Sequence, residues 1–147
     1  MSKPSRPRAR RKPPAAAAGA PGQNVVDSSG WLEYFADAPN ANRFARAIEA
    51  VARLVVPSIT LYEVYKRLDA ERGRAYAQRG VAQMMQGLVI DLDAHVALTA
   101  AQISRAERLP MADSIILATS RLHRATLWTQ DEHFEHIPGV RYFPKAP

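Results

Sequence analysis

Four acidic residues of the sequence lie beside apolar segments and not in polar stretches. They are Asp27, Glu63, Asp113 and Asp131. Carboxylates that gather at one point repel one another and raise one another's pKa, so a cluster of them persists only with a compensating cation. Hard oxygen ligands suit Mg²⁺ or Mn²⁺, and these ions activate water and stabilise displacement at phosphorus. The residue types therefore predict a metal centre for phosphodiester hydrolysis, provided that the fold brings the four together.

Each acid also has a structural interpretation when it is taken alone. An Asp that follows a strand often caps the next helix, as Asp27 would. Glu63 alone would be a surface residue of a helix, and Asp131 alone an ordinary loop residue. Asp113 carries the strongest signal, because it directly precedes the run Ser114–Ala118, which is typical of a buried helix. A charged group at such a position needs a functional or structural reason.

The alternation of short apolar runs with helical periods indicates strands separated by helices. Strands are expected at 24–26, 54–56, 88–90 and 125–129, with an edge strand at 140–143. Helices are expected at 40–52, 58–72, 75–85, 93–108 and 110–123, with Asp93 as the cap of the fourth. A further helix is expected to begin near Trp31 with Ser28 or Ser29 as its cap. Strands connected by helices form a mostly parallel sheet. We therefore expect an α/β fold with about five strands.

This topology has a consequence for the four acids. Sites in open parallel sheets lie beyond the carboxyl ends of the strands. Asp27 and Asp131 follow predicted strands, and Glu63 lies early in the helix after another. Asp113 joins them if its helix begins on the same side of the sheet. Three hydroxyls stand close enough in the sequence to orient the carboxylates or a bound water, namely those of Ser28, Ser29 and Thr129.

The charge of the chain is unevenly distributed. Residues 1–23 are rich in Pro, Arg and Ala, contain six basic residues and no acid, and are expected to be a disordered tail. Because the chain has 20 Lys and Arg and 14 Asp and Glu, the domain expected at 24–147 keeps 14 of each and is neutral. The tail is either a solvated extension or an arm that contacts nucleic acid. The absence of cysteines fits a reducing compartment, no apolar run suits a membrane span, and we expect a cytoplasmic protein.

The chain resembles PIN-domain ribonucleases, and among them the VapC-type toxins of bacterial toxin–antitoxin pairs. The resemblance covers about residues 24–144 and departs from the family in the basic tail. It rests on four segments, which are 25–29 (VVDSS), 57–63 (PSITLYE), 112–119 (ADSIILAT) and 127–134 (LWTQDEHF).

This resemblance implies a three-layer α/β/α fold with a parallel sheet. It also implies Mg²⁺-dependent cleavage of RNA, with Mn²⁺ as a further candidate cofactor, and an acidic site formed by Asp27, Glu63, Asp113 and Asp131. The implied partners are a cognate antitoxin and a second copy of the chain, which would form a homodimer.

Two other functions stay open from the sequence. The first is a PIN-like module that binds RNA or protein without cutting, although such a module has no need for a repulsive acidic cluster. The second is a nuclease with a housekeeping role in RNA processing. A neutral domain lacks a broad basic surface, so phosphate contacts would have to come from local pairs such as Arg43 with Arg46 or Arg121 with Arg124. The pair His133 and His136 is set aside as a metal site for want of a third nitrogen ligand.

Overall fold

A five-stranded sheet forms the centre of the computed structural model, which describes residues 22–147. The strands are β1 (Asn24–Val26), β2 (Leu54–Pro57), β3 (Leu88–Ile90), β4 (Thr126–Thr129) and β5 (Val140–Tyr142). Their order in the sheet is β3-β2-β1-β4-β5, and every neighbouring pair is parallel. The predicted parallel α/β sheet is therefore confirmed.

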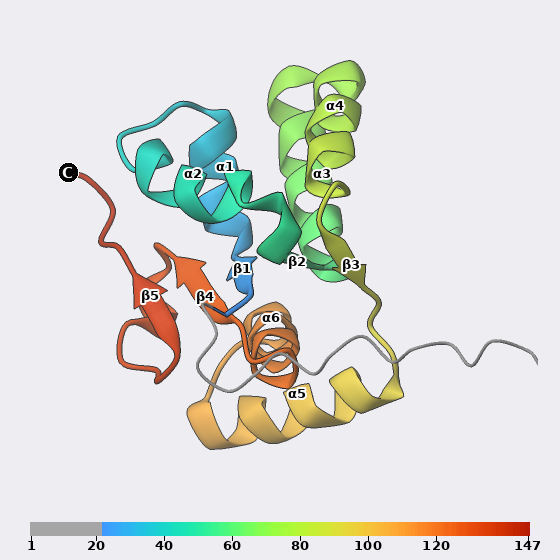
Figure 1. Ribbon diagram of the computed structural model, residues 1–147, viewed down its shortest axis with the longest axis vertical. Coiled ribbons are helices and arrows are strands. Elements are labelled where there is room, and N and C mark those ends of the chain that lie inside the picture. The colour runs from blue at the N-terminus through green and yellow to red at the C-terminus, as the bar shows by residue number, and fades with distance from the viewer. Residues whose placement is uncertain (1–21) are drawn as a thin grey trace, which may run out of the picture.

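Six α-helices cover the two faces of this sheet. They are α1 (Ser28–Phe35), α2 (Ala41–Glu49), α3 (Ser58–Arg72), α4 (Arg74–Met84), α5 (Ala94–Glu107) and α6 (Met111–Leu122). Figure 1 shows α1 to α4 on one side of the sheet and α5 with α6 on the other, which makes three layers. Two short 3₁₀ turns, Val51–Arg53 and Glu132–Phe134, complete the regular structure.

The strands divide the buried side chains between two cores because neighbouring residues of a strand face opposite sides of the sheet. Val25 and Leu127 lie in the core beneath α5 and α6. Val26 and Trp128 lie in the core beneath α1 to α4. The packing of both layers therefore fixes the position of each strand end, and the acids of the candidate site lie close to these ends.

The sequence-based element boundaries were wrong at two places near the site. The first helix begins at Ser28 and not near Trp31, with Asp27 in extended conformation at the N-cap position but without a side-chain cap bond. Ser28 and Ser29 do not cap it, because their hydroxyls bond to carboxylates instead. The helix expected at 40–52 ends at Glu49 and is followed by the 3₁₀ turn. Asp93, by contrast, caps α5 as predicted and accepts from the Val96 amide at 2.8 Å.

The expected disordered tail lies outside the described residues, apart from its last two positions. Within residues 22–147, no helix combines the length and apolar character needed to cross a membrane.

Gly30 allows α1 to pack closely against α2. A Cβ at this position would lie 2.7 Å from Phe44 ring atoms and 2.7 Å from a Val26 methyl group. We expect Gly30→Ala to lower the free energy of unfolding by about 1–3 kcal/mol, because overpacking outweighs the gain in helix propensity. Urea titration would measure the change. Gly80→Ala is the matched control, since its short contact is with one terminal methyl group of Leu68, which can move. Equal effects of the two variants would contradict this account.

Candidate metal centre

The ends of β1 and β4 bring two of the four acids to one edge of the sheet. Val26 pairs with Trp128, and the Asp27 amide donates to the Trp128 carbonyl at 2.9 Å. Asp27 therefore lies opposite Thr129, and Asp131 follows two residues later. The amide of Asp131 donates to Thr129 Oγ1 at 2.9 Å, which ties the loop back to the strand.

Two helices supply the remaining acids. The helix α3 begins directly after β2, so Glu63 lies in its second turn above the same edge of the sheet. The helix α6 begins at Met111 after Pro110, and Asp113 lies in its first turn. The next seven residues of α6 are buried, as the sequence predicted for the run after Asp113. This burial holds the Asp113 backbone rigidly at the rim.

Asp27 is the most enclosed acid of the four, with 3% of its surface exposed. Its Oδ2 accepts from Ser29 Oγ at 2.7 Å and from Thr129 Oγ1 at 2.9 Å. Burial nevertheless raises its pKa, against these two hydrogen bonds, and the charges of Asp131 and Glu63 add to the rise. Glu63 is oriented in a similar way, because its Oε1 accepts from Ser28 Oγ at 2.7 Å.

The pKa of Asp113 depends on the other three acids of the cluster. Burial, together with the charges of Asp27, Asp131 and Glu63, raises its pKa from 3.8 to about 7, although the nearby His133 lowers it. All four predicted acids therefore lie close enough to interact electrostatically. Their roles as metal ligands stay a prediction, but the structure gathers them at one rim.

His133 belongs to this group, although the sequence analysis set it aside. Its Nδ1 lies 3.0 Å from Asp131 Oδ1 and 3.3 Å from Asp113 Oδ2. Donor atoms of these three residues lie within 4.8 Å of one another, which is a spacing that a single cation can bridge. The charge of Asp131 raises the pKa of His133, so the imidazole tends to carry the positive charge itself. Its position two residues after Asp131 is the sequence signal that could have placed His133 in the site.

His136, the other member of the set-aside pair, does not contact this group. Its Nε2 lies 3.9 Å from the Glu135 carboxylate, and 91% of its side chain is exposed.

A buried polar network holds the loop between Thr129 and Asp131. Gln130 Nε2 donates to Glu33 Oε2 at 3.0 Å, and Gln130 Oε1 accepts from Asn40 Nδ2 at 3.1 Å. The backbone amide of Asn40 in turn donates to Glu33. Sequence patterns did not predict this network, since its members are far apart in the chain and each is an ordinary polar residue.

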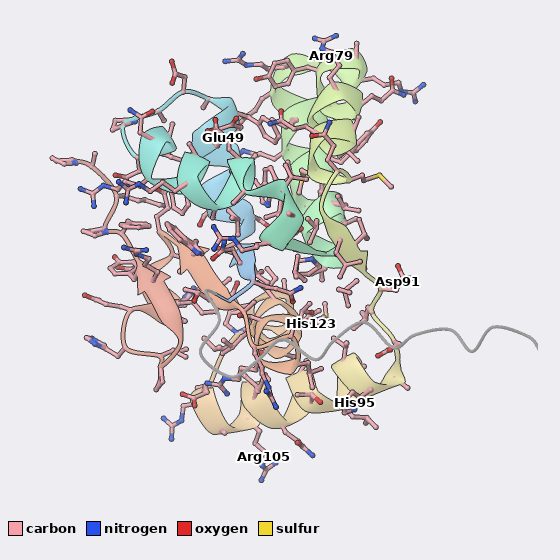
Figure 2. The ribbon with its side chains drawn as sticks, in the orientation of Figure 1. Glu49, Arg79, Asp91, His95, Arg105 and His123 are labelled. Atoms are coloured by element: carbon pink, nitrogen blue, oxygen red, sulfur yellow. The ribbon has the colours of Figure 1, made fainter. Side chains whose placement is uncertain are left out.

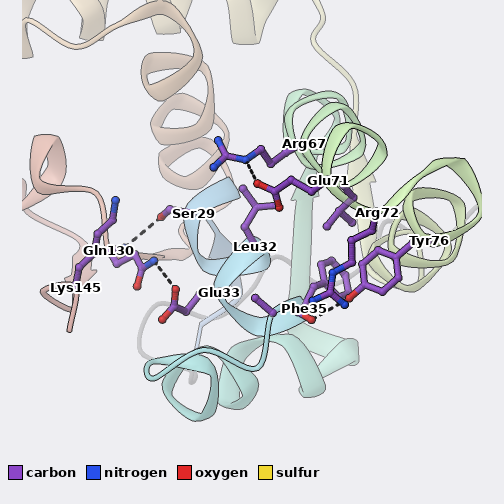
Figure 3. Close-up of a pocket in the computed structure, with 12 residues that line it drawn as sticks. Ser29, Leu32, Glu33, Phe35, Arg67, Glu71, Arg72, Tyr76, Gln130 and Lys145 are labelled. Carbon is purple, nitrogen blue, oxygen red and sulfur yellow. Dashed lines mark hydrogen bonds and ion pairs between the residues drawn. The ribbon is translucent and has the colours of Figure 1, made fainter. Parts of the chain in front are cut away.

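A groove of about 330 Å³ leads away from the acids beside this network. Figure 3 shows Ser29, Glu33 and Gln130 at one end of the groove, and Arg72 and Tyr76 at the other, on α3 and α4. The groove is lined by basic side chains, those of Arg67, Arg72 and Lys145, and by acidic ones, those of Glu33 and Glu71.

The PIN domain family model matches residues 25–140, which include all four acids. The chain belongs to the PIN domain family. A comparison with curated protein sequences gives no match.

Solved structures of several toxins share this PIN domain fold. A toxin–antitoxin complex from Klebsiella pneumoniae is 23% identical, with a TM-score of 0.70 over 81% of this chain and 96% of that one. A DNA-bound VapBC complex from Salmonella typhimurium is 18% identical, with a TM-score of 0.65 over 84% of this chain and 98% of that one. A sarcin–ricin loop-cleaving VapC toxin from Mycobacterium tuberculosis is 17% identical, with a TM-score of 0.66 over 79% and 95%.

The cluster of acids makes the metal-free PIN domain sensitive to pH. Asp113 binds its proton more tightly in the folded protein than in the unfolded chain, where its pKa is near 3.8. The contribution of Asp113 to the free energy of unfolding should therefore be largest below about pH 4 and should be lost as the pH rises to about 7. The raised pKa values of Asp27 and His133 act in the same direction. Thermal unfolding in EDTA across this range would test it, and a melting temperature that rises through the window would contradict it.

Removing one charge from the cluster should stabilise the metal-free protein. We expect Asp113→Asn to raise the free energy of unfolding at pH 8 in EDTA by on the order of 2 kcal/mol, because it relieves like-charge repulsion. It should also flatten the fall in stability between pH 4 and 7. Asp69→Asn, at an exposed position of α3, is the matched control and should change neither quantity. A destabilised Asp113→Asn protein would show that the carboxylates do not repel one another.

Proposed function

We propose that this PIN domain is a divalent-metal-dependent endoribonuclease that acts as the toxin of a type II toxin–antitoxin pair. The observation that carries the proposal is the rise of the Asp113 pKa to about 7 among three other carboxylates. Such a concentration of like charge costs stability, so a fold retains it where a bound cation repays the cost. The PIN domain match and the toxins of the same fold support the reaction class.

The donor set fits a hard divalent cation. Four carboxylates, two of which accept hydrogen bonds from hydroxyl groups, offer oxygen ligands of the kind that Mg²⁺ and Mn²⁺ prefer. Asp27, Glu63, Asp113 and Asp131 would hold the ion, and Ser28, Ser29 and Thr129 keep the carboxylates oriented through the bonds described above. When bound, the cation supplies a Lewis acid that favours hydroxide formation and neutralises charge at phosphorus.

Two of the acids would have different roles, since Asp27 would position the cation and Asp113 would release a proton when the cation binds. Asp27 is fixed by two hydroxyl donors and has the least freedom to move, so it defines where the cation binds. Asp113, with a pKa of about 7, is protonated in about half of the metal-free molecules at neutral pH and loses this proton when positive charge arrives. Cation binding should therefore release protons. The polar network around Gln130 keeps Asp131 in register with both.

Regulation by an antitoxin fits the same geometry. The groove beside Gln130 opens toward the acids and has room for an extended segment of a partner protein. A basic side chain of that segment could enter the carboxylate cluster in place of the cation, as the imidazole of His133 already approaches it. Homodimerisation and a cytoplasmic location belong to this proposal as well. A non-catalytic binding module is the alternative, and the retained acids count against it.

The proposal predicts metal-dependent RNA cleavage that depends on the acids. Purified protein freed of any antitoxin should cut cellular RNA into discrete fragments with Mg²⁺ or Mn²⁺ and should be inactive in EDTA. Asp27→Asn and Asp113→Asn should each reduce the cleavage rate by about 100-fold or more, because an amide keeps the shape but removes the charge. Electrophoresis of end-labelled RNA would measure both rates.

The matched control is Asp69→Asn, which should cleave at the unchanged rate. Cleavage retained in both site variants would remove the mechanism. Metal binding without any cleavage by the wild-type protein would favour the binding module.

A further inference from the structure

Three arginines converge on a second groove, which lies between α2 and the strands β4 and β5. Asn42, Arg43, Arg46, Trp128, Arg141 and Phe143 line it, between α2 and the edge of the sheet, and we call it the arginine groove. Its volume is about 350 Å³. The sequence analysis noted Arg43 and Arg46 as a local pair, and the fold adds Arg141 from a strand almost 100 residues later.

Aromatic rings hold two of these guanidinium groups in place. The Cζ atom of Arg43 lies 5.2 Å from the centre of the Phe143 ring, and that of Arg141 lies 4.6 Å from the centre of the Trp128 ring. The Phe143 ring in turn lies 5.5 Å from Phe44 and 5.9 Å from Trp128, so the floor of the groove is well packed. Cation–ring contacts orient the two guanidinium planes before any ligand arrives.

The positive charge of this groove is not neutralised by neighbouring acids. None of its lining residues is acidic, and none of the ion pairs within residues 22–147 includes Arg43, Arg46 or Arg141. The other arginine pair noted in the sequence is different, because Arg121 lies 3.9 Å from the Glu107 carboxylate. In a domain that is neutral as a whole, three unpaired arginines on one groove form a distinct site for an anion.

The arginine groove is tied to the acidic centre by short connections. Trp128 directly precedes Thr129, whose hydroxyl donates to Asp27. At the start of α2, Asn40 donates through Nδ2 to both Gln130 and the Pro144 carbonyl. The helix that carries Arg43 and Arg46 is therefore anchored to the loop that carries Asp131 and to the segment after Phe143.

We propose that the arginine groove binds backbone phosphates of the RNA substrate beside the cleavage site. The inference rests on the proposed nuclease function and deepens it. A polyanion that approaches four carboxylates is repelled, so productive binding needs cationic contacts nearby. Guanidinium groups match the oxygens of a phosphate with two parallel hydrogen bonds. Guanidinium groups already cover the ring faces of Phe143 and Trp128, so these rings cannot stack on bases. The groove therefore contacts phosphates and sugars and does not distinguish one base from another.

The test is the salt dependence of RNA binding. Full-length protein, with its basic tail in every variant, would be titrated with a labelled single-stranded RNA in EDTA, which prevents cleavage. Changing Arg43, Arg46 and Arg141 together to Gln should reduce the slope of log Kd against log salt concentration by about 2, since each phosphate contact to a single strand contributes about 0.7. Affinity at about 50 mM salt should fall by tenfold or more.

The matched control changes three exposed arginines elsewhere, namely Arg74, Arg79 and Arg105, to Gln. Figure 2 shows Arg79 and Arg105 at opposite ends of the molecule, pointing away from it. This variant has the same net charge as the groove variant and should lose little of the slope. Equal losses in the two variants would overturn the proposal, because they would show a general charge effect.

A purely structural role for the arginines gives a different result. If they only cover the rings, the melting temperature falls and the RNA slope is unchanged, which would overturn the proposal. The single variant Arg46→Gln removes one charge of the groove without removing a packing contact, because Arg46 has no cation–ring contact within the described residues. It should lower the slope by about 0.7 with an unchanged melting temperature.

Two further readouts separate this inference from the function on which it rests. Loss of a co-purifying acidic protein with unchanged RNA binding would assign the groove to a protein partner and overturn the proposal. Absence of cleavage by the wild-type protein with Mg²⁺ would count against the nuclease itself, and the binding slopes do not depend on that result. Cleavage by the groove variant with a raised KM and a retained kcat would support both.

Discussion

Repulsion among four carboxylates at one edge of the sheet is the constraint on which the rest of this structure depends. Burial and like charge raise the pKa values of Asp27 and Asp113, so the folded protein holds these groups against their electrostatic preference. The surrounding fold limits the cost in two ways. Hydroxyl groups donate to Asp27 and Glu63, and the imidazole of His133 lies between Asp113 and Asp131. Neither contact removes the repulsion, which supports the proposal that the site binds a cation.

The sheet order turns this local chemistry into a rigid site. Because β1 and β4 are neighbours at the centre of the sheet, both are buried on two faces and their ends cannot shift independently. The positions of Asp27 and Thr129 are therefore fixed by the same packing. The first turn of α6 and the second turn of α3 complete the rim from separate layers, so a displacement of either helix would separate the acids.

The distribution of charge suits a ligand that is itself charged along its length. Acids occupy one end of the sheet, while unpaired arginines occupy the groove between α2 and β5. The folded domain has equal numbers of basic and acidic residues, so this separation is a property of placement and not of composition. The proposed contacts to RNA phosphates would use the arginine groove. The proposed antitoxin segment would use the groove beside α1 and Gln130.

The sequence by itself determined the parallel α/β fold and the rim to which the four acids belong. Apolar periodicity is a local property, and it identified the buried strands, the buried helix after Asp113 and the cap at Asp93. Only the tertiary structure decided which distant side chains meet. The start of α1 at Ser28, the place of His133 between two acids and the approach of Arg141 to Arg43 all depend on sheet order and strand register. The long-range contacts among these, such as that of His133 with Asp113, are not encoded in any short stretch of sequence, because the packing of the whole fold brings the partners together.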